Sequence, residues 1–340
     1  MHSKNSDTDV ARMVELITGG LSTQVVRSFA ELSIADVLAK SPATLDELCS
    51  AIGTDPDATL RLLRAGIALR LVTMANARFS PTPLLDTLRQ DSPVSLSGWA
   101  TIMGSPGAWL PWGRFVDAIR TGERQTLPTL GKEYFEYLGS APDEAKAFTV
   151  GMGGISASIG AAAATVIDTS DVSVAADIGG ASGLLLHALL SSNPHLKGIV
   201  YDRPDVVPFA NDAAQQAGVG GRATAIAGDF LESVPEADLY LLKWILHDWD
   251  DAHSIQILKN CRRAMRPGGR VVVMELQLGE MDDPGLSSLM DLNMLVVLNG
   301  RERTTREYAE LFSNADLRST QVTPLQAPLG PWSILEAKAA

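Results

Sequence analysis

The 340-residue sequence predicts an α/β fold in which a helical N-terminal region precedes a mostly parallel sheet with an antiparallel last strand. Three observations support this prediction. The first part of the chain has apolar residues at three- and four-residue spacing, which is typical of amphipathic helices. From about residue 170, short β-branched runs alternate with helical segments, as they do in parallel βαβ units. The last two strand-like runs are separated only by a loop, so we expect them to pair antiparallel.

The overall composition bounds the function. The net charge of −12 repels nucleic acid and anionic membranes, so neither is an expected partner. The chain has no apolar run near the ~20 residues that a membrane span needs and no apolar signal core, which predicts a soluble, cytoplasmic protein. Cys49 and Cys261 are too few for a disulfide framework, and we expect both to be buried in helices.

The N-terminal region resembles the outline of a winged helix. We expect three helices and then a short hairpin, at residues 14–39, 44–53, 55–72 and 71–82. Thr44 and Asp55 each precede an amphipathic run, as helix N-caps do. Winged helices often bind DNA, but acidic residues outnumber basic ones over residues 1–100. A packing or dimerisation role is therefore favoured over a transcription factor.

The middle of the chain is mostly helical and is interrupted by glycine and proline. Large apolar side chains lie among these breaks, where they either fill a core or line a pocket; they are Met103, Trp109, Trp112, Phe148 and Met152. We divide the chain into an N-terminal domain at 1–100, a helical connector at 101–165 that contributes to a substrate pocket, and an α/β domain at 166–340.

Glycines follow the first predicted strand of the α/β domain. The turn that begins at Asp177 contains Gly179 and runs directly into a helix, which lets a ligand approach the backbone and the helix N-terminus. The second strand ends at Asp202, whose carboxylate can accept hydrogen bonds from both ribose hydroxyls of a nucleoside. These two features alone permit either NAD or S-adenosylmethionine (SAM).

Three further features favour SAM. After the third strand, Gly228 is followed by Asp229, which can accept an adenine amino proton, and by Phe230, which can cover the adenine face. The fourth predicted strand, residues 238–246, carries Lys243 near the expected place of a cofactor carboxylate. The antiparallel last strand is a feature that SAM-binding sheets have and dinucleotide-binding sheets usually lack.

At this point four segments identify a family. LLKWILHDWDD, RPGGR, VVVMEL and MDLNMLVVLNGRERT together resemble the large O-methyltransferase family that includes plant caffeic-acid and isoflavone enzymes and many bacterial natural-product enzymes. The resemblance covers nearly the whole chain. It implies a Rossmann-like SAM-dependent methyltransferase fold, a winged-helix-like dimerisation domain at 1–100 and a homodimer.

The resemblance also implies a role for individual residues. The residues expected to contact SAM, or the product S-adenosylhomocysteine, are Gly179, Asp202, Gly228, Asp229, Phe230 and Lys243. Catalysis would belong to His247, with Glu275 and Glu302 flanking its ring. The residues expected to contact the substrate are Met103, Trp112, Phe148, Met152, Asp248, Met290, Met294 and Asn299.

The chemistry explains why a histidine and two carboxylates are wanted. A neutral phenol is a poor nucleophile, and ionising it fully at pH 7 costs roughly 4 kcal/mol because its pKa is near 10. Imidazole can take that proton at neutral pH, and a glutamate on the other ring nitrogen would fix the tautomer. We therefore expect methylation of a hydroxyl group, phenolic in character, on a small aromatic metabolite. The alternative is the same fold using SAM without methyl transfer, in hydroxylation, decarboxylation or pericyclic steps.

Two departures from the family pattern concern cofactor binding. Ala181 and Ser182 replace a glycine and a threonine in the turn, and Arg203 follows Asp202 where an apolar residue is commoner.

A metal site at His247, Asp248 and His253 is disfavoured, because a six-residue spacing on one helix points two imidazoles apart. We expect no metal.

Overall fold

The computed structural model describes residues 3–92, 94–327 and 330–340. The chain forms two compact units, of which the first extends to Leu110 and includes Phe135–Gly154, while the second comprises Pro111–Tyr134 and Ile155–Ala340. The predicted connector at 101–165 is thus shared between the two units, and the three-part division of the chain stays a prediction. No helix among the described residues is long and apolar enough to cross a membrane.

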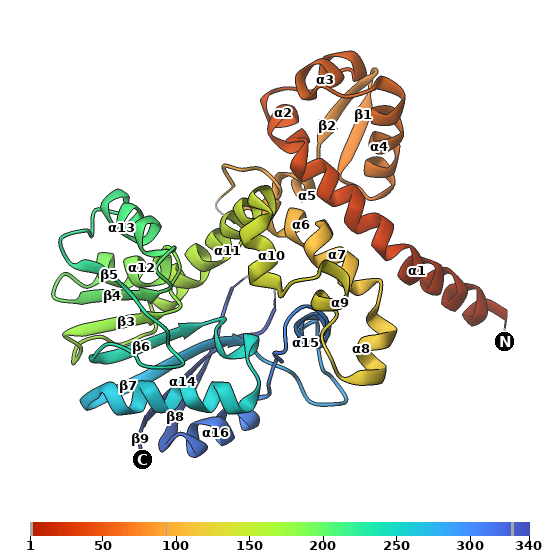
Figure 1. Cartoon of the computed structure of the whole chain (residues 1–340). Coiled ribbons are helices and arrows are strands. Elements are labelled where there is room, and N and C mark those ends of the chain that lie inside the picture. The colour runs from red at the N-terminus through yellow and green to blue at the C-terminus, as the bar shows by residue number, and fades with distance from the viewer. Residues whose placement is uncertain (1–2, 93, 328–329) are drawn as a thin grey trace. The chain divides into compact units, whose positions relative to one another are not determined.

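The first unit has the predicted helices and hairpin (Figure 1). Its elements are α1 (Ser3–Glu31), α2 (Ile34–Lys40), α3 (Leu45–Ile52), α4 (Pro56–Ala68), β1 (Val72–Ala75), β2 (Arg78–Pro81), α5 (Pro83–Asp86), α6 (Ser97–Gly104), most of α7 (Pro106–Trp112), most of α10 (Tyr134–Ser140) and the first part of α11 (Pro142–Ala163). Both N-caps are confirmed. Thr44 forms a capping box with Glu47, and the Asp55 side chain accepts a hydrogen bond from the Ala58 amide.

The first long helix begins and ends earlier than the sequence predicts. Residues 14–39 were expected to form one helix, but α1 ends at Glu31 and α2 begins at Ile34. Ser33 between them has a φ of 53°, in the left-handed region that breaks a right-handed helix. The break allows Phe29 and Ile34, both fully buried, to enter the same core.

The second unit is built on a seven-stranded sheet with the order β5-β4-β3-β6-β7-β9-β8. Its strands are β3 (Val174–Ile178), β4 (Lys197–Asp202), β5 (Ala223–Ala227), β6 (Ala237–Lys243), β7 (Met265–Leu276), β8 (Leu317–Leu325) and β9 (Trp332–Ala339). The first five pair in parallel, whereas β9 pairs antiparallel with both β7 and β8. The predicted sheet, with its antiparallel last strand, is confirmed.

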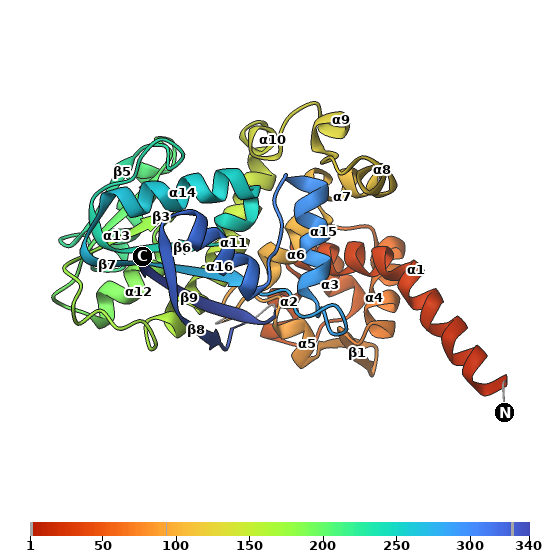
Figure 2. The same ribbon diagram turned by 90° about the horizontal axis from the view of Figure 1, so that it is seen from below.

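Helices pack on both faces of this sheet. Those in contact with its strands include α12 (Leu184–Ser192), α13 (Val207–Gln216), α14 (Asp251–Ala264) and α16 (Thr305–Asn314). The unit also contains α8 (Phe115–Thr121), α9 (Thr126–Leu130), α15 (Ser287–Val297) and the short helix η1 (Leu246–Asp248). Figures 1 and 2 show α14 and α16 on one face of the sheet, with α12 on the other. Successive side chains of a strand point to opposite faces, so burial on both sides makes β3, β6 and β7 almost continuously apolar.

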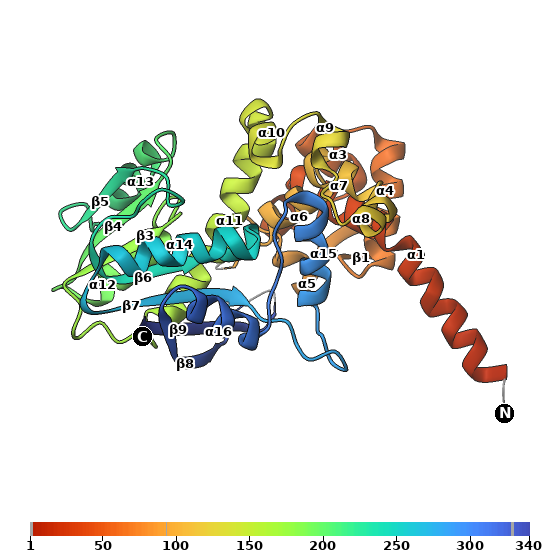
Figure 3. The ribbon, with the colours of Figure 1, turned by 60° about the horizontal axis from the view of Figure 1, so that its bottom comes forward.

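The end of β6 and the start of α14 decide where several polar residues of this unit lie. The predicted fourth strand was expected to continue through Leu246, but β6 stops at Lys243 because Trp244 adopts a φ of 53° and turns the chain into η1. The helix α14 then begins after Asp250, whose side chain accepts a hydrogen bond from the His253 amide, as an N-cap does. The view in Figure 3 follows α14 along the sheet.

Candidate active site

The predicted cofactor residues lie where the strand order of the sheet reverses. β3 has β4 on one side and β6 on the other, and all three run parallel. Open α/β sheets bind ligands outside the carboxyl ends of their strands at such a switch point. The turn after β3, Asp202 at the end of β4 and Lys243 at the end of β6 share this edge.

The turn after β3 is held against Asp202. Gly179 has a φ of 65°, and a Cβ at this position would lie 2.5 Å from Cδ1 of Ile245, so the turn has no room for a side chain there. One Asp202 oxygen accepts the Ala181 amide hydrogen at 2.8 Å, and the other accepts that of Arg203 at 2.7 Å. The Arg203 guanidinium pairs with Asp205 instead of reaching the Asp202 carboxylate.

The residues after β5 have local contacts of their own. Asp229 accepts a hydrogen bond from the Leu231 amide at 2.8 Å, and the Phe230 ring packs edge to face against Trp249 at 5.9 Å between centroids. A Cβ at Gly228 would collide with the hydroxyl of Tyr201, which is a packing reason for glycine at this position. Two aromatic rings and a carboxylate therefore stand together at this end of the sheet.

Lys243 and Asp177 influence each other's pKa beside the glycine turn. The Lys243 ammonium donates a hydrogen bond to the Ser156 hydroxyl at 2.7 Å, and burial lowers its pKa to about 8 against the attraction of Asp177. Burial likewise raises the pKa of Asp177 to about 7, with Lys243 opposing the shift. Asp177 Oδ2 is buried without a hydrogen-bond partner among the described residues. The sequence analysis named Asp177 only as the start of the turn. An acidic residue near the end of an otherwise apolar strand was the signal that could have identified it as a site residue.

These residues fit SAM by their chemistry. Asp202 can accept ribose hydroxyls, Phe230 offers an aromatic face to adenine, and Lys243 can pair with a carboxylate. The buried, unpartnered oxygen of Asp177 needs a donor, and an amino group beside the glycine turn would provide one.

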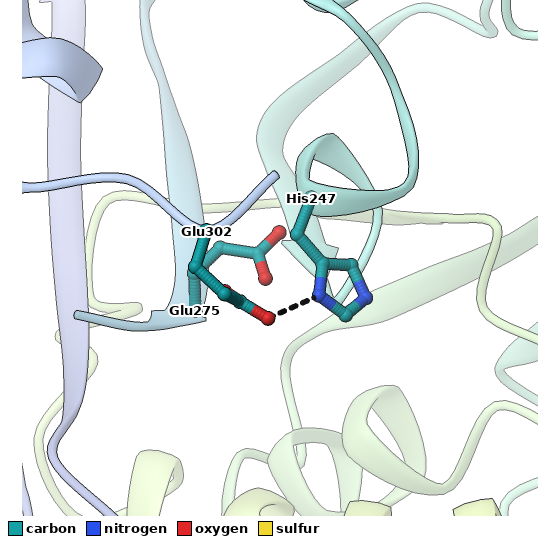
Figure 4. Close-up of side chains that lie close together, drawn as sticks. All are labelled: His247, Glu275 and Glu302. Atoms are coloured by element: carbon teal, nitrogen blue, oxygen red, sulfur yellow. Dashed lines mark hydrogen bonds and ion pairs between the residues drawn. The ribbon is translucent and has the colours of Figure 1, made fainter. Parts of the chain in front are cut away.

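His247 and Glu302 form a buried pair in η1 and the segment after α15. His247 Nδ1 lies 2.9 Å from Glu302 Oε1 (Figure 4). An ionised carboxylate only accepts hydrogen bonds, so Nδ1 carries the hydrogen of this bond, and in the neutral form of the ring the lone pair is on Nε2. His247 is 6% exposed and Glu302 fully buried, which protects the bond from water.

Glu275 lies beside this pair but holds the backbone rather than the ring. Its Oε1 accepts the amide hydrogens of Ile245 at 3.0 Å and Leu246 at 3.1 Å, and so caps the turn that leads into η1. Figure 4 shows the Glu275 carboxylate next to that of Glu302, at the end of β7. The sequence predicted that Glu275 flanks the imidazole; no bond from Glu275 to the ring is formed among the described residues.

Carboxylates control the charge of the imidazole. Burial lowers the pKa of His247, but Glu302, Asp248 and Glu275 outweigh this effect and raise that pKa to about 10. Asp248 Oδ1 lies 3.3 Å from Nε2 of His247. Burial raises the pKa of Glu275 to about 7 and that of Asp248 to about 6, against the attraction of His247. The ring is therefore protonated near neutrality when nothing else approaches it.

Trp244 is a neighbour of the imidazole that sequence reasoning missed. Its ring is stacked on that of His247, with centroids 5.6 Å apart and an interplanar angle of 5°. The Lys243 ammonium lies 5.1 Å from the centroid of the same indole. Trp244 immediately precedes the turn to η1, so its left-handed backbone is what brings the ring under His247.

The same cluster could in principle hold a metal ion. His247, Glu275 and Glu302 each offer a ligand atom, and these atoms lie within 4.8 Å of one another. All three groups already have partners, since His247 Nδ1 bonds to Glu302 and Glu275 accepts two amides. The alternative set suggested by the sequence is separated, because the His253 ring bonds to Asp250 at 2.7 Å.

The predicted substrate residues belong to both units. In the second unit, the Trp112 indole donates a hydrogen bond to Asn293 at 2.9 Å. Met290 and Met294 share a face of α15 at a spacing of four residues. Asn299 is exposed beyond the end of this helix.

The other predicted substrate residues lie in the first unit. Met103 is on α6, and Phe148 and Met152 are on α11. Phe148 packs edge to face against Phe135, with centroids 6.1 Å apart. Their assignment to a substrate pocket stays a prediction.

Ala181 provides a test of how rigid the glycine turn is. It has a φ of 50°, a conformation that alanine tolerates and that is a genuine outlier for a β-branched residue. We expect Ala181→Val to lose roughly 1–3 kcal/mol of stability and to weaken S-adenosylhomocysteine binding, whereas Ala181→Gly keeps both near wild type. Thermal unfolding and calorimetry measure the two effects, and equal affinity in all three proteins would contradict a rigid turn.

Comparisons with known proteins agree with this geometry. The O-methyltransferase domain model matches residues 112–318, and the O-methyltransferase dimerisation domain model matches residues 14–91. Phenazine O-methyltransferase PhzM of Lysobacter antibioticus is 35% identical over 328 residues, which cover 96% of this chain and 95% of that protein. O-demethylpuromycin-O-methyltransferase of Streptomyces alboniger is 38% identical over 334 residues, which cover 96% of this chain and 88% of that protein.

A solved structure extends the comparison to the bound cofactor. NcsB1, an O-methyltransferase from neocarzinostatin biosynthesis, was crystallised with SAM and 2-hydroxy-5-methyl naphthoic acid. It is similar to this chain with a TM-score of 0.80 and 31% identity, and the match covers 94% of this chain and 96% of that one. The predicted fold class is thereby confirmed, as is the choice of SAM over NAD. The chain belongs to the O-methyltransferase family and is a SAM-dependent O-methyltransferase with a dimerisation domain at residues 14–91.

Proposed function

We propose that this enzyme methylates a phenolic hydroxyl group of a small aromatic, natural-product-like metabolite, and that His247 is the general base. The observation that carries the proposal is the buried bond between His247 Nδ1 and Glu302, which leaves Nε2 as the proton acceptor. The names of the relatives supply the substrate class, since they include a phenazine methyltransferase and a complex with a hydroxylated naphthoic acid.

In this mechanism His247 Nε2 takes the proton of the acceptor hydroxyl, and the oxygen becomes the nucleophile. The imidazolium that forms is stabilised by the Glu302 carboxylate, which accepts the Nδ1 hydrogen throughout. Glu275 keeps the turn that carries His247 in place through two backbone amides. When bound, SAM supplies an electrophilic methyl group that needs no activation, and S-adenosylhomocysteine is the product.

Asp248 has a double position in this proposal. In the structure it lies 3.3 Å from Nε2, where the acceptor hydroxyl must approach. A hydroxyl that enters replaces Asp248 as the partner of Nε2, and the carboxylate can then accept a hydrogen bond from a second polar group on the ring of the substrate. This keeps Asp248 among the substrate-binding residues, as the sequence predicts.

Use of SAM without methyl transfer is the competing function. His247 and Glu302 together form a general base with its carboxylate partner at the turn after β6. An enzyme that does not transfer a methyl group has no need of this arrangement. The two functions differ in their products. Methyl transfer gives S-adenosylhomocysteine and an O-methyl ether in equal amounts, whereas the alternative consumes no SAM.

The proposed function predicts transfer of labelled methyl from SAM to phenols. A panel of hydroxyphenazines, hydroxynaphthoates and hydroxybenzoates should contain acceptors, and their O-methyl ethers should be inert controls.

We expect undiminished turnover in EDTA, because His247 and not a metal ion removes the proton. A strict requirement for magnesium would instead assign His247, Glu275 and Glu302 to a metal site, and conversion without SAM consumption would support the competing function.

We further propose that the enzyme is a homodimer, in which α1 packs against a second copy. The side chains of α1 that are more than half exposed include Val10, Met13, Val14, Leu16, Ile17 and Leu21. Figure 1 shows the N-terminal half of α1 extending away from the other helices of its unit. An apolar face of this size favours an interface, and the family model assigns residues 14–91 to dimerisation.

The expected result is a particle of twice 36.2 kDa in light scattering at micromolar concentration. Replacing both Ile17 and Leu21, which are 73% and 69% exposed, by glutamate should give the monomer, because charge cannot be buried unpaired in an apolar interface. Met281→Glu is the matched control, since Met281 is 95% exposed in the second unit. A wild-type monomer would contradict the prediction.

A further inference from the structure

We propose that Arg303 is a positioning residue that fixes the turn carrying His247, and thereby sets the direction of the imidazole towards the acceptor hydroxyl. The inference rests on the proposed role of His247 as the general base and extends it to a residue that touches neither substrate nor cofactor. Arg303 is 1% exposed and directly follows Glu302 in the chain.

The Arg303 guanidinium binds the turn on both sides of His247. Nη1 donates to the carbonyl of Leu246 at 3.0 Å, and Nη2 donates to the carbonyl of Trp249 at 2.9 Å. Nε and Nη2 also bind one oxygen of Asp251 at 3.0 and 2.7 Å. A single planar group thus joins residues before and after His247 to the start of α14.

The turn depends on side chains from other segments, and besides Arg303 the Ser254 hydroxyl donates to the carbonyls of Leu246 and Trp249, at 3.2 and 3.5 Å. The helix η1 is three residues long and has no side-chain cap at its N-terminal residue, Ile245. Short 3₁₀ segments have poor hydrogen-bond geometry and leave carbonyls without partners. Arg303 supplies donors to the carbonyls of Leu246 and Trp249, while Glu275 supplies the acceptor for the amides at its start.

The segment that holds Glu302 is also tied to the turn through its backbone. The Arg301 amide donates to the His247 carbonyl at 2.8 Å, and the Glu302 amide donates to Asp291 at 2.9 Å. A Cβ at Gly300 would collide with the His247 carbonyl oxygen, so the two backbones are in close contact here. The distance between His247 and Glu302 is therefore set by a clamp in which Arg303 provides the side-chain half.

Lysine cannot replace this group. The guanidinium presents five donors in one plane, and this site uses Nε and both Nη atoms in three directions. A lysine ammonium is a single point of charge and reaches one or two of these acceptors. Arg303→Lys keeps the positive charge and most of the packing but loses the fork.

Arg270 offers a matched control for the loss of a buried arginine. It is 5% exposed in the middle of β7, where it pairs with Glu336 and Asp171 at 3.1 Å each. Glu275 lies five residues further along the same strand, near its carboxyl end, so Arg270 is set back from the active site along the strand. Replacing Arg270 should lower stability without moving the imidazole.

The experiment compares Arg303→Lys, Arg303→Met and Arg270→Met. We expect Arg303→Lys to lower kcat by about tenfold and Arg303→Met by up to about 100-fold, because small misplacement of a reacting group has effects of this size. The dissociation constant of S-adenosylhomocysteine should stay within about threefold of wild type. The rise of kcat/KM with pH, which follows deprotonation of His247, should occur at lower pH in both Arg303 variants. The reason is that the Glu302 carboxylate is less well aligned with the ring and stabilises the imidazolium less. Arg270→Met should lower the unfolding temperature while kcat and the pH limb stay unchanged.

Each outcome decides the proposal. Folded Arg303→Lys enzyme with wild-type kcat and pH limb would overturn it, as would Arg270→Met showing the same loss of kcat and the same shift. If Arg303→Met does not fold, Arg303→Lys alone carries the test. Failure of the proposed function is recognised separately, because His247→Gln would then keep full activity. Loss of activity in His247→Gln with a wild-type Arg303→Lys enzyme rejects only the role of Arg303.

Discussion

His247→Gln is expected to lower kcat by at least about 100-fold, while S-adenosylhomocysteine binds as in the wild type. Glutamine fills a similar volume and can hydrogen-bond to Glu302, but its amide cannot take a proton from a phenol. The residues proposed to bind the cofactor, among them Asp202, keep their own contacts after the change. Steady-state kinetics with a phenolic acceptor and calorimetry with S-adenosylhomocysteine separate the two quantities.

The pH profile of His247→Gln adds a second check. Without a base, only acceptor that is already ionised can react, so activity should recover as the solution approaches the phenol pKa near 10. An acceptor made more acidic by an electron-withdrawing substituent should lose less activity in the variant than an ordinary phenol. A His247→Gln enzyme with full activity on both acceptors would contradict the base role.

Glu302→Gln is expected to lower kcat by roughly tenfold, less than the loss in His247→Gln, because it removes a charged hydrogen-bond partner but leaves the base. It should also change the pH profile. The neutral imidazole is the active form, so kcat/KM rises as pH passes the pKa of His247, which the surrounding carboxylates raise to about 10. Glu302 is the largest contributor to that rise, and removing its charge lowers the pKa. The rise of kcat/KM should therefore occur at a pH that is lower by roughly one to three units.

Glu275→Gln is the matched control for this change. It also removes one negative charge near the imidazole, but the Gln carbonyl can still accept the amides of Ile245 and Leu246. We expect a smaller loss of kcat and a smaller movement of the limb than in Glu302→Gln. Equal effects of the two variants would show that charge alone matters and that the direct bond at 2.9 Å does not.

Many features of this protein follow from local sequence signals. Thr44 and Asp55 were recognisable as N-caps because capping involves residues only three positions apart. The strands of the second unit could be predicted from their β-branched, apolar runs, since both faces of a parallel sheet are buried. The places of Gly179 and Asp202 followed too, because a glycine turn and an acidic strand end mark the switch point of such a sheet.

Other features needed the tertiary structure. Ser33 and Trp244 adopt left-handed backbone conformations that no propensity favours, and each breaks an element that the sequence predicts to continue. These conformations cost energy locally and persist because the packing around them requires the turn. The division of the predicted substrate residues between two units also lies beyond local signals, since it depends on contacts between distant helices.

The sequence by itself, through its resemblance to a family, determined the fold class and the cofactor, and it suggested candidate residues for the active site. Only the tertiary structure decided how these residues are connected. His247 and Glu302 are 55 positions apart, and their bond forms because η1 and the segment after α15 meet in the folded chain. The same folding lets Glu275 accept a backbone amide of the turn, and it lets Arg303 donate to carbonyls that precede and follow His247. Hydrogen bonds between distant segments depend on distance and direction in space, which side-chain chemistry and spacing along the chain do not specify.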